Sequence, residues 1–108
     1  MRSLNRLYTI LYSDLCKGVF FKIDNTDNVM NFLESDSKKL VYYVNDEDII
    51  TKNSNWDLKV EKDIVNLYIG GYCYIVMNYV DGKLHVLNEH GVRKIWTRRA
   101  KLKYKSCS

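Results

Sequence analysis

The dipeptide Asp81-Gly82 lies between two segments with the residue pattern of strands, 72–80 and 83–87. A two-residue type I′ turn needs positive φ at both central positions, and Asp-Gly is one of the sequences that supplies it. This turn fixes the register of the two strands, so Val80 should face Lys83 and Ile75 should face Asn88. The apolar face of the predicted hairpin then consists of Ile75, Met77, Tyr79, Leu84 and Val86.

The hairpin continues into further strands. Residues 88–91 predict a second turn, with Gly91 able to adopt positive φ. Residues 92–96 predict a third strand, residues 97–100 a short break, and residues 101–104 a last alternating segment with Leu102 and Tyr104 inward.

The N-terminal region follows a helical period instead. Apolar side chains spaced three and four residues apart predict an amphipathic helix over residues 3–16, and Gly18 is suited to end it. The apolar positions of this helix are Leu4, Leu7, Tyr8, Leu11, Tyr12 and Leu15.

The middle of the chain is less regular. Residues 19–23, 40–44 and 56–60 are rich in β-branched and aromatic residues and predict strands. Residues 27–34 predict a short helix. Residues 45–55 predict an exposed loop around a buried pair, Ile49 and Ile50, and residues 61–69 fit either a helical turn or a strand.

Together these segments predict one α+β domain over residues 1–108, in which the N-terminal amphipathic helix packs on a small, mostly antiparallel sheet. A length of 108 residues suits one domain with a modest core.

The C-terminal part resembles the small SH3-like barrels of the KOW and Tudor type, many of them encoded by phages. The resemblance covers residues 64–105 and divides the chain into residues 1–60, a helix plus strands, and an SH3-like part. It implies a binding module, because some members of the family bind nucleic acid and others bind proteins. The absence of proline and the abundance of asparagine and lysine also fit an AT-rich phage or bacterial genome. The segments that carry the resemblance are Gly71-Tyr72-Cys73-Tyr74-Ile75-Val76, Asp81-Gly82-Lys83-Leu84-His85-Val86-Leu87 and Glu89-His90-Gly91.

Charge is distributed unevenly along the chain. Residues 1–60 carry eight Lys/Arg and nine Asp/Glu, whereas residues 61–108 carry nine and four. From residue 91 onward there are seven basic residues and no acidic one. Cations on one surface neutralise phosphates, and an exposed aromatic ring can stack on an unpaired base. We therefore expect a non-catalytic protein that contacts DNA or RNA through a basic C-terminal surface formed by Arg93, Lys94, Trp96, Arg98, Arg99, Lys101 and Lys103.

Two other interpretations of this segment stay open. Trp96 and Tyr104 could belong to the core, with the lysines on the solvated side of an edge strand. The partner could also be an acidic host protein that this chain inhibits or redirects, and a free edge strand would allow homo-oligomerisation. The acidic run at residues 46–48 could bind a divalent cation or screen the basic end, although a solvated loop is the simpler interpretation.

Nothing in the sequence indicates an enzyme or a cofactor. The three cysteines are far apart and form no zinc-binding pair, and Cys73 is predicted on the face opposite His85. The interrupted apolar pattern of the first residues is not that of a signal peptide, and no segment has the length of a membrane span. The expected location is the cytoplasm, that of the host if the protein is viral.

Overall fold

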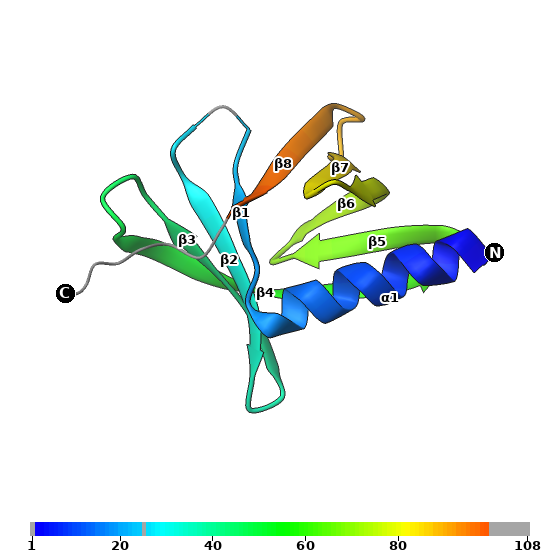
Figure 1. The fold of residues 1–108 in the computed structure, drawn as a ribbon, viewed down its shortest axis with the longest axis horizontal. Coiled ribbons are helices and arrows are strands. Elements are labelled where there is room, and N and C mark those ends of the chain that lie inside the picture. Colours follow the sequence, from blue (N-terminus) through cyan, green and yellow to red (C-terminus); the bar gives the residue numbers. More distant parts are fainter. Residues whose placement is uncertain (1, 25, 100–108) are drawn as a thin grey trace.

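The computed structural model describes residues 2–24 and 26–99 and shows one helix and eight strands (Figure 1). Each strand pairs in antiparallel fashion with its neighbours in the chain, and β1 also pairs with β8, so that the sheet closes into a barrel. The elements are α1 (Arg2–Lys17), β1 (Phe20–Lys22), β2 (Val29–Ser35), β3 (Lys38–Val44), β4 (Ile50–Glu61), β5 (Ile64–Ile69), β6 (Tyr72–Val80), β7 (Lys83–Leu87) and β8 (Arg93–Arg99). The predicted α+β arrangement of an N-terminal helix on an antiparallel sheet is thus confirmed.

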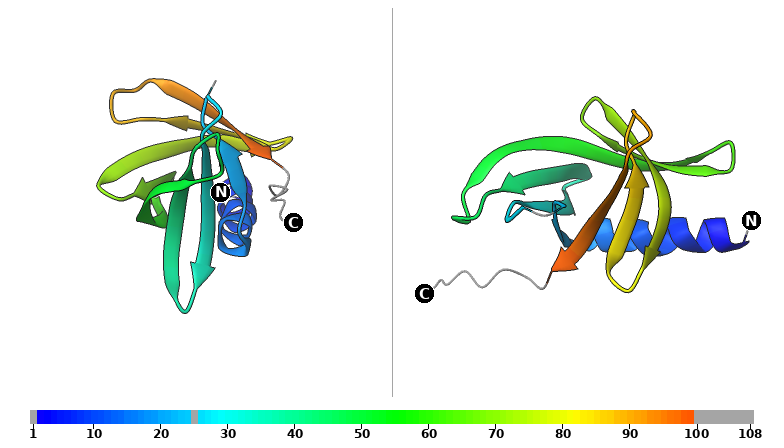
Figure 2. Two further views of the ribbon diagram at one scale, coloured as in Figure 1. Left: turned by 90° about the vertical axis from the view of Figure 1, so that its left-hand side faces the viewer. Right: turned by 90° about the horizontal axis from the view of Figure 1, so that it is seen from above.

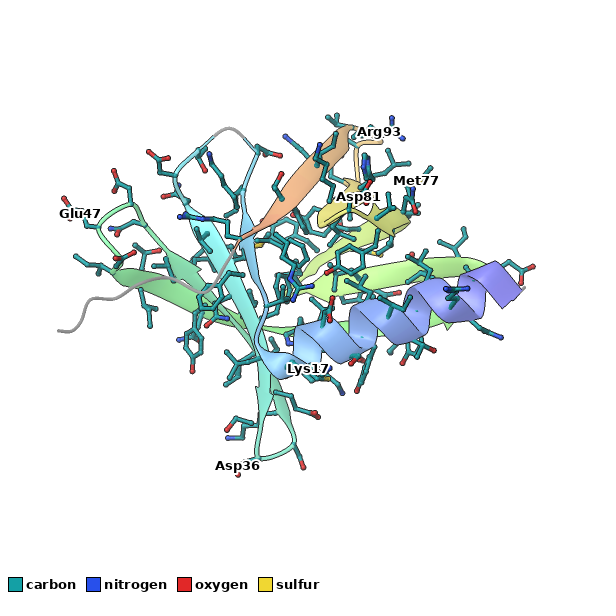
Figure 3. All side chains as sticks on the ribbon, viewed as in Figure 1. Lys17, Asp36, Glu47, Met77, Asp81 and Arg93 are labelled. Atoms are coloured by element: carbon teal, nitrogen blue, oxygen red, sulfur yellow. The ribbon has the colours of Figure 1, made fainter. Side chains whose placement is uncertain are left out.

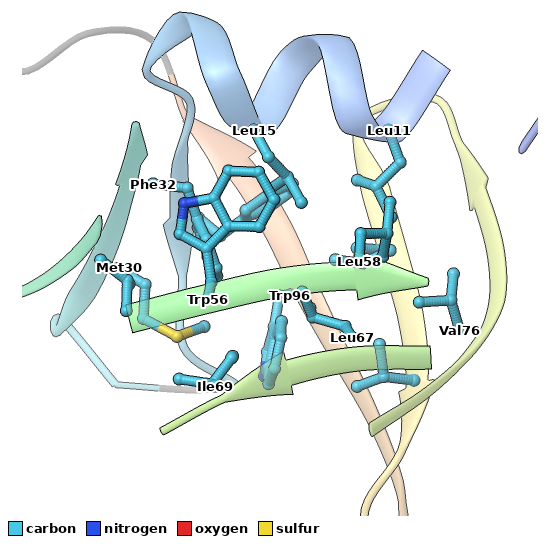
Figure 4. Close-up of a cluster of buried hydrophobic side chains, with 14 of the residues drawn as sticks. Leu11, Leu15, Met30, Phe32, Trp56, Leu58, Leu67, Ile69, Val76 and Trp96 are labelled. Atoms are coloured by element: carbon cyan, nitrogen blue, oxygen red, sulfur yellow. The ribbon is translucent and has the colours of Figure 1, made fainter. Parts of the chain in front are cut away.

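The helix α1 forms as predicted and lies along the barrel beside β2, β4, β5 and β6 (Figures 1 and 2). Its apolar stripe points toward the strands, and Leu11 and Leu15 are completely buried there (Figure 4). Gly18 ends the helix with a φ of 103°, a conformation that costs glycine little because it has no Cβ.

The barrel interior is filled by large apolar side chains from every strand. Phe21 and Phe32 pack edge to face, as do Phe32 and Trp56, with ring centroids 6.0 and 6.2 Å apart. Strand β4 is long because its two halves pair with different strands. Its first half, through residue 55, pairs with β3, and residues 56–61 pair with β5.

The predicted hairpin is present, with one change of register. Asp81 and Gly82 have φ values of 54° and 73°, and Val80, Tyr79 and Asn78 pair with Lys83, Leu84 and His85 as expected. A β-bulge between Val76 and Asn78 then shifts the pairing, so that Ile75 faces Leu87 rather than Asn88. The bulge changes which side chains enter the core. Val76 is buried in place of Met77, which is 47% exposed.

The predicted helix over residues 27–34 is wrong, because this segment contains strand β2. The apolar residues of this segment are spaced as in a helix because, at the start of β2, side chains on both faces of the sheet are buried. Met30 faces the main core, whereas Val29 belongs to a second, smaller cluster with Phe20 and Val44 on the opposite side of the sheet. A strand buried on both faces loses the simple alternation that identifies strands in a sequence.

The predicted loop over residues 45–55 is also wrong in part. A short turn follows Asn45, whose side-chain oxygen accepts hydrogen bonds from the backbone N–H groups of Glu47 and Ile49. Strand β4 then begins at Ile50, and the predicted buried pair is exposed, with Ile49 and Ile50 at 53% and 56%.

The segment over residues 61–69 proves to be a turn followed by strand β5. Lys62 and Asp63 form the turn with φ values of 52° and 63°, a two-residue connection without glycine.

Strand β8 closes the barrel and extends further than predicted. It continues through Arg99 without the expected break after Trp96, and its last three residues pair with β1. The strands after residue 64 therefore share one barrel with those before it. Among the described strands none lies at an edge, so the free edge required for the predicted mode of homo-oligomerisation is not found there. The predicted segment 101–104 lies outside the described residues.

Candidate binding face

Strand β8 presents its cations to two opposite sides of the barrel wall. Trp96 points into the core and therefore defines the inward side, which Lys94 and Arg98 share. The residues between them point outward and are Arg93, Ile95, Thr97 and Arg99.

Trp96 is not available for stacking on a base. Its side chain is only 3% exposed, and its ring packs edge to face on Tyr74 at a centroid distance of 5.1 Å. The predicted stacking role is therefore wrong for this structure, and the alternative that Trp96 belongs to the core is confirmed. The corresponding prediction for Tyr104 lies outside the described residues.

The two inward cations reach the two rims of the barrel, and each meets a carboxylate. Lys94 Nζ lies 3.7 Å from Asp24 Oδ2. Arg98 donates from Nη1 to Asp14 Oδ2 at 3.0 Å, an oxygen that also accepts from the Tyr79 hydroxyl at 2.7 Å. Half of the predicted cations that the structure describes are thus partly neutralised within the molecule.

The outward cations of β8 are joined by lysines from both neighbouring strands. Thr97 is paired with Lys83 of β7 on one side and with Lys22 of β1 on the other. Lys83 and Lys22 point outward because Leu84 and Phe21, their neighbours in the chain, are completely buried. Two strand spacings separate the two lysines, about 10 Å, and six residues separate Arg93 from Arg99, about 20 Å.

We name this surface the cationic face, the outward side of β7, β8 and β1. Arg93, at the start of β8, marks one end of it (Figure 3). None of the outward positions on these three strands is acidic. The face combines four cations with uncharged residues. It consists of Lys22, Lys83, His85, Leu87, Arg93, Ile95, Thr97 and Arg99, beside the buried Phe20.

Sequence reasoning missed two of the four cations of this face, for different reasons. Lys83 could have been found, because the hairpin register already placed it opposite the apolar face. Lys22 could not, because its position depends on the pairing of β1 with β8, and these strands are more than 70 residues apart in the chain. Lys101 and Lys103 lie outside the described residues.

The thiol and imidazole groups form no catalytic arrangement in the described part of the chain. The bulge in β6 places Cys73 on the same outward side as His85, contrary to prediction. The two remain apart, because His85 pairs with Asn78, five residues from Cys73. Burial, together with a hydrogen bond to Glu34, raises the pKa of the Cys16 thiol, which disfavours the reactive thiolate.

No group of three or more His, Cys, Asp or Glu residues in the described ranges is arranged to hold a metal ion. The acidic run at residues 46–48 takes part in none of the ion pairs found in residues 2–24 and 26–99. These pairs involve Asp14, Asp24 and Asp57 instead.

Within the described residues, α1 is too short and too polar to cross a membrane. Comparison of the chain with protein-family models, with curated proteins and with solved structures gives no match.

Proposed function

We propose that this protein is a non-catalytic nucleic-acid-binding protein whose cationic face contacts the phosphate backbone of DNA or RNA. The observation that supports this most is the meeting of Lys22, Lys83 and the outward arginines on three adjacent strands without an acidic side chain among them. Three strands of a closed barrel also hold these groups at fixed spacing, so little order has to be gained when a charged backbone binds.

The composition of the face indicates how it would bind. It contains no exposed phenylalanine, tyrosine or tryptophan ring that could stack on a base. Its only uncharged polar side chains that could read base edges are those of His85 and Thr97. The lysines and arginines would therefore contact mainly phosphates, and those contacts carry no sequence information. Neutralising about four phosphates on duplex DNA predicts a slope of log K against log salt of about −3.6.

A binding titration tests this function. Labelled duplex DNA, single-stranded DNA and RNA are titrated at about 50 mM and about 200 mM salt, and the affinity for duplex DNA should fall roughly 100-fold between the two. Weak binding of all three that does not change with salt would rule out the proposal.

One feature of the same face favours a protein partner as the second candidate. Ile95 lies between the cations and is 41% exposed, and an apolar residue at the centre of a charged patch suits a protein with an acidic rim. Capture of partners from a lysate treated with nuclease separates the two functions, because a partner recruited through nucleic acid is lost. Such a partner would be a host protein that this chain inhibits or redirects. The SH3-like character, the phage origin and the cytoplasmic location stay predictions.

A further inference from the structure

A groove opens at the end of β8, beside the cationic face. It has a volume of about 430 Å³ and lies between the end of α1, β1, the end of β8 and the turn that joins β6 to β7. Figure 2 shows α1, the end of β8 and this turn on the same side of the molecule. The groove is lined by Lys17, Gly18, Val19, Phe20, Gly82, Arg98 and Arg99.

Three cations line this groove and no acidic residue does. Lys17 comes from the last turn of α1 and the two arginines from the end of β8. Asp14 offsets part of the charge of Arg98, to which it is bound at 3.0 Å, and the carbonyl end of α1 adds a partial negative charge that Lys17 opposes. The lining of the groove therefore keeps a net positive charge.

The guanidinium group of Arg98 can bind a ligand in addition to Asp14. The side chain is 50% exposed, and only Nη1 donates to Asp14. A guanidinium group carries five N–H donors, so donors remain for a ligand in the groove. The backbone N–H of Arg98 also donates to the Gly82 carbonyl at 2.6 Å, which holds the β6–β7 turn against β8 and fixes two walls of the groove relative to each other.

We propose that this groove binds the terminal phosphate of a nucleic acid strand whose backbone runs along the cationic face. The inference rests on the proposed function. An internal phosphodiester carries one negative charge, which the separated cations of the face suit, whereas a phosphate monoester carries about −1.5 to −2 at neutral pH. The groove has three cationic residues in its lining, and Arg99 belongs to both surfaces and connects them.

The experiment compares oligonucleotides of one sequence that differ only in their ends: a 5′-phosphate, a 3′-phosphate, or hydroxyl groups at both ends. Each is titrated against the parent protein, Lys17→Ala and the control Lys38→Ala, which removes an exposed lysine from the start of β3. Phosphate at one end should strengthen binding about fivefold or more, as expected for added charge-assisted hydrogen bonds. Lys17→Ala should lose this gain and keep its affinity for the hydroxyl oligonucleotide, and Lys38→Ala should keep the gain.

The outcomes separate the groove from the face. Salt-dependent binding that is equal for all three oligonucleotides, or a gain that persists in Lys17→Ala, overturns the terminal-phosphate site and leaves the proposed function intact. Absence of salt-dependent binding to any of them overturns both. A phosphoserine peptide and inorganic phosphate are titrated in parallel. Preference for the peptide, with no gain from phosphate on the oligonucleotides, assigns the groove to a protein partner and overturns the proposal.

Discussion

The guanidinium group of Arg98 and the carboxylate of Asp14, 84 residues apart in the chain, meet at 3.0 Å and fasten the last described strand to the first helix. The same carboxylate oxygen accepts the hydroxyl of Tyr79 from β6. Asp14 therefore connects three elements at the rim of the barrel where α1 packs, and its side chain is only 19% exposed.

Replacement of Asp14 should destabilise the fold. Asp14→Ala leaves the hydroxyl of Tyr79 and part of Arg98 without a partner, and we expect a loss of about 1–3 kcal/mol in the free energy of unfolding. Urea denaturation measures this loss. Asp27→Ala, at an exposed position between β1 and β2, is the matched control and should stay within about 0.5 kcal/mol of the parent. Equal effects of the two substitutions would show that the three-element contact does not stabilise the protein.

The same contact predicts a dependence of stability on alkaline pH. Burial, reinforced by the hydrogen bond to Asp14, raises the pKa of Tyr79 to about 12 from its ordinary value of 10.0. The phenol then stays protonated in the folded protein while it ionises in the unfolded chain, so its stabilising effect is complete below pH 10 and is lost as the pH rises to about 12.

Tyr79→Phe tests this dependence by difference. The parent's advantage in unfolding free energy over Tyr79→Phe should shrink between pH 10 and about 12. Tyr68, whose pKa the hydrogen bond to Glu61 also raises to about 12, is present in both proteins and cancels from the difference. Tyr72→Phe, at a ring that is 63% exposed, controls for the loss of a phenol. An advantage over Tyr79→Phe that is constant across this range would contradict the account.

Two adjacent glycines between β5 and β6 should respond differently to alanine. Gly70 has a φ of 59°, and a Cβ there would lie 2.7 Å from Ser54 Oγ, whereas a Cβ on Gly71 would meet nothing within 4 Å. We expect Gly70→Ala to cost about 1–3 kcal/mol and Gly71→Ala about 0.5 kcal/mol or less. Thermal and urea unfolding give both values. Adding Ser54→Ala to Gly70→Ala should restore the part of the unfolding free energy that is lost to the clash with Ser54. If nothing is restored, the whole loss comes from the backbone conformation at residue 70.

The structure also shows which sequence patterns were sufficient to predict elements of the fold. The hairpin at Asp81-Gly82 and the helix over residues 3–16 depend on local chemistry, namely a turn with positive φ and a helical apolar stripe, and both predictions held. The failures have non-local causes. The bulge beside Met77 places Val76 in the core of the closed barrel, and the second apolar cluster around Val29 hides the alternation of β2.

The residues of the cationic face also divide into those that a local pattern predicts and those that depend on long-range strand pairing. Alternation along β8 separates the outward Arg93 and Arg99 from the inward Lys94 and Arg98, and the buried Trp96 shows which side is which. The sequence alone gave no means of deciding whether Trp96 was core or surface. Lys22 joins the face only because β1 pairs with β8, a contact that no local pattern encodes.

The central claim is that binding depends on where the cations lie and not on the net charge of the chain. Lys83→Glu with Arg93→Glu reverses two charges on the cationic face, and Lys38→Glu with Lys62→Glu reverses two exposed charges on other turns and strands, so both variants have the same net charge. The affinity of each for duplex DNA is measured at about 50 mM salt, alongside circular dichroism to establish folding. We predict that the face variant loses at least about 100-fold in affinity and that the control loses less than about tenfold. Equal losses in the two folded variants would contradict the account.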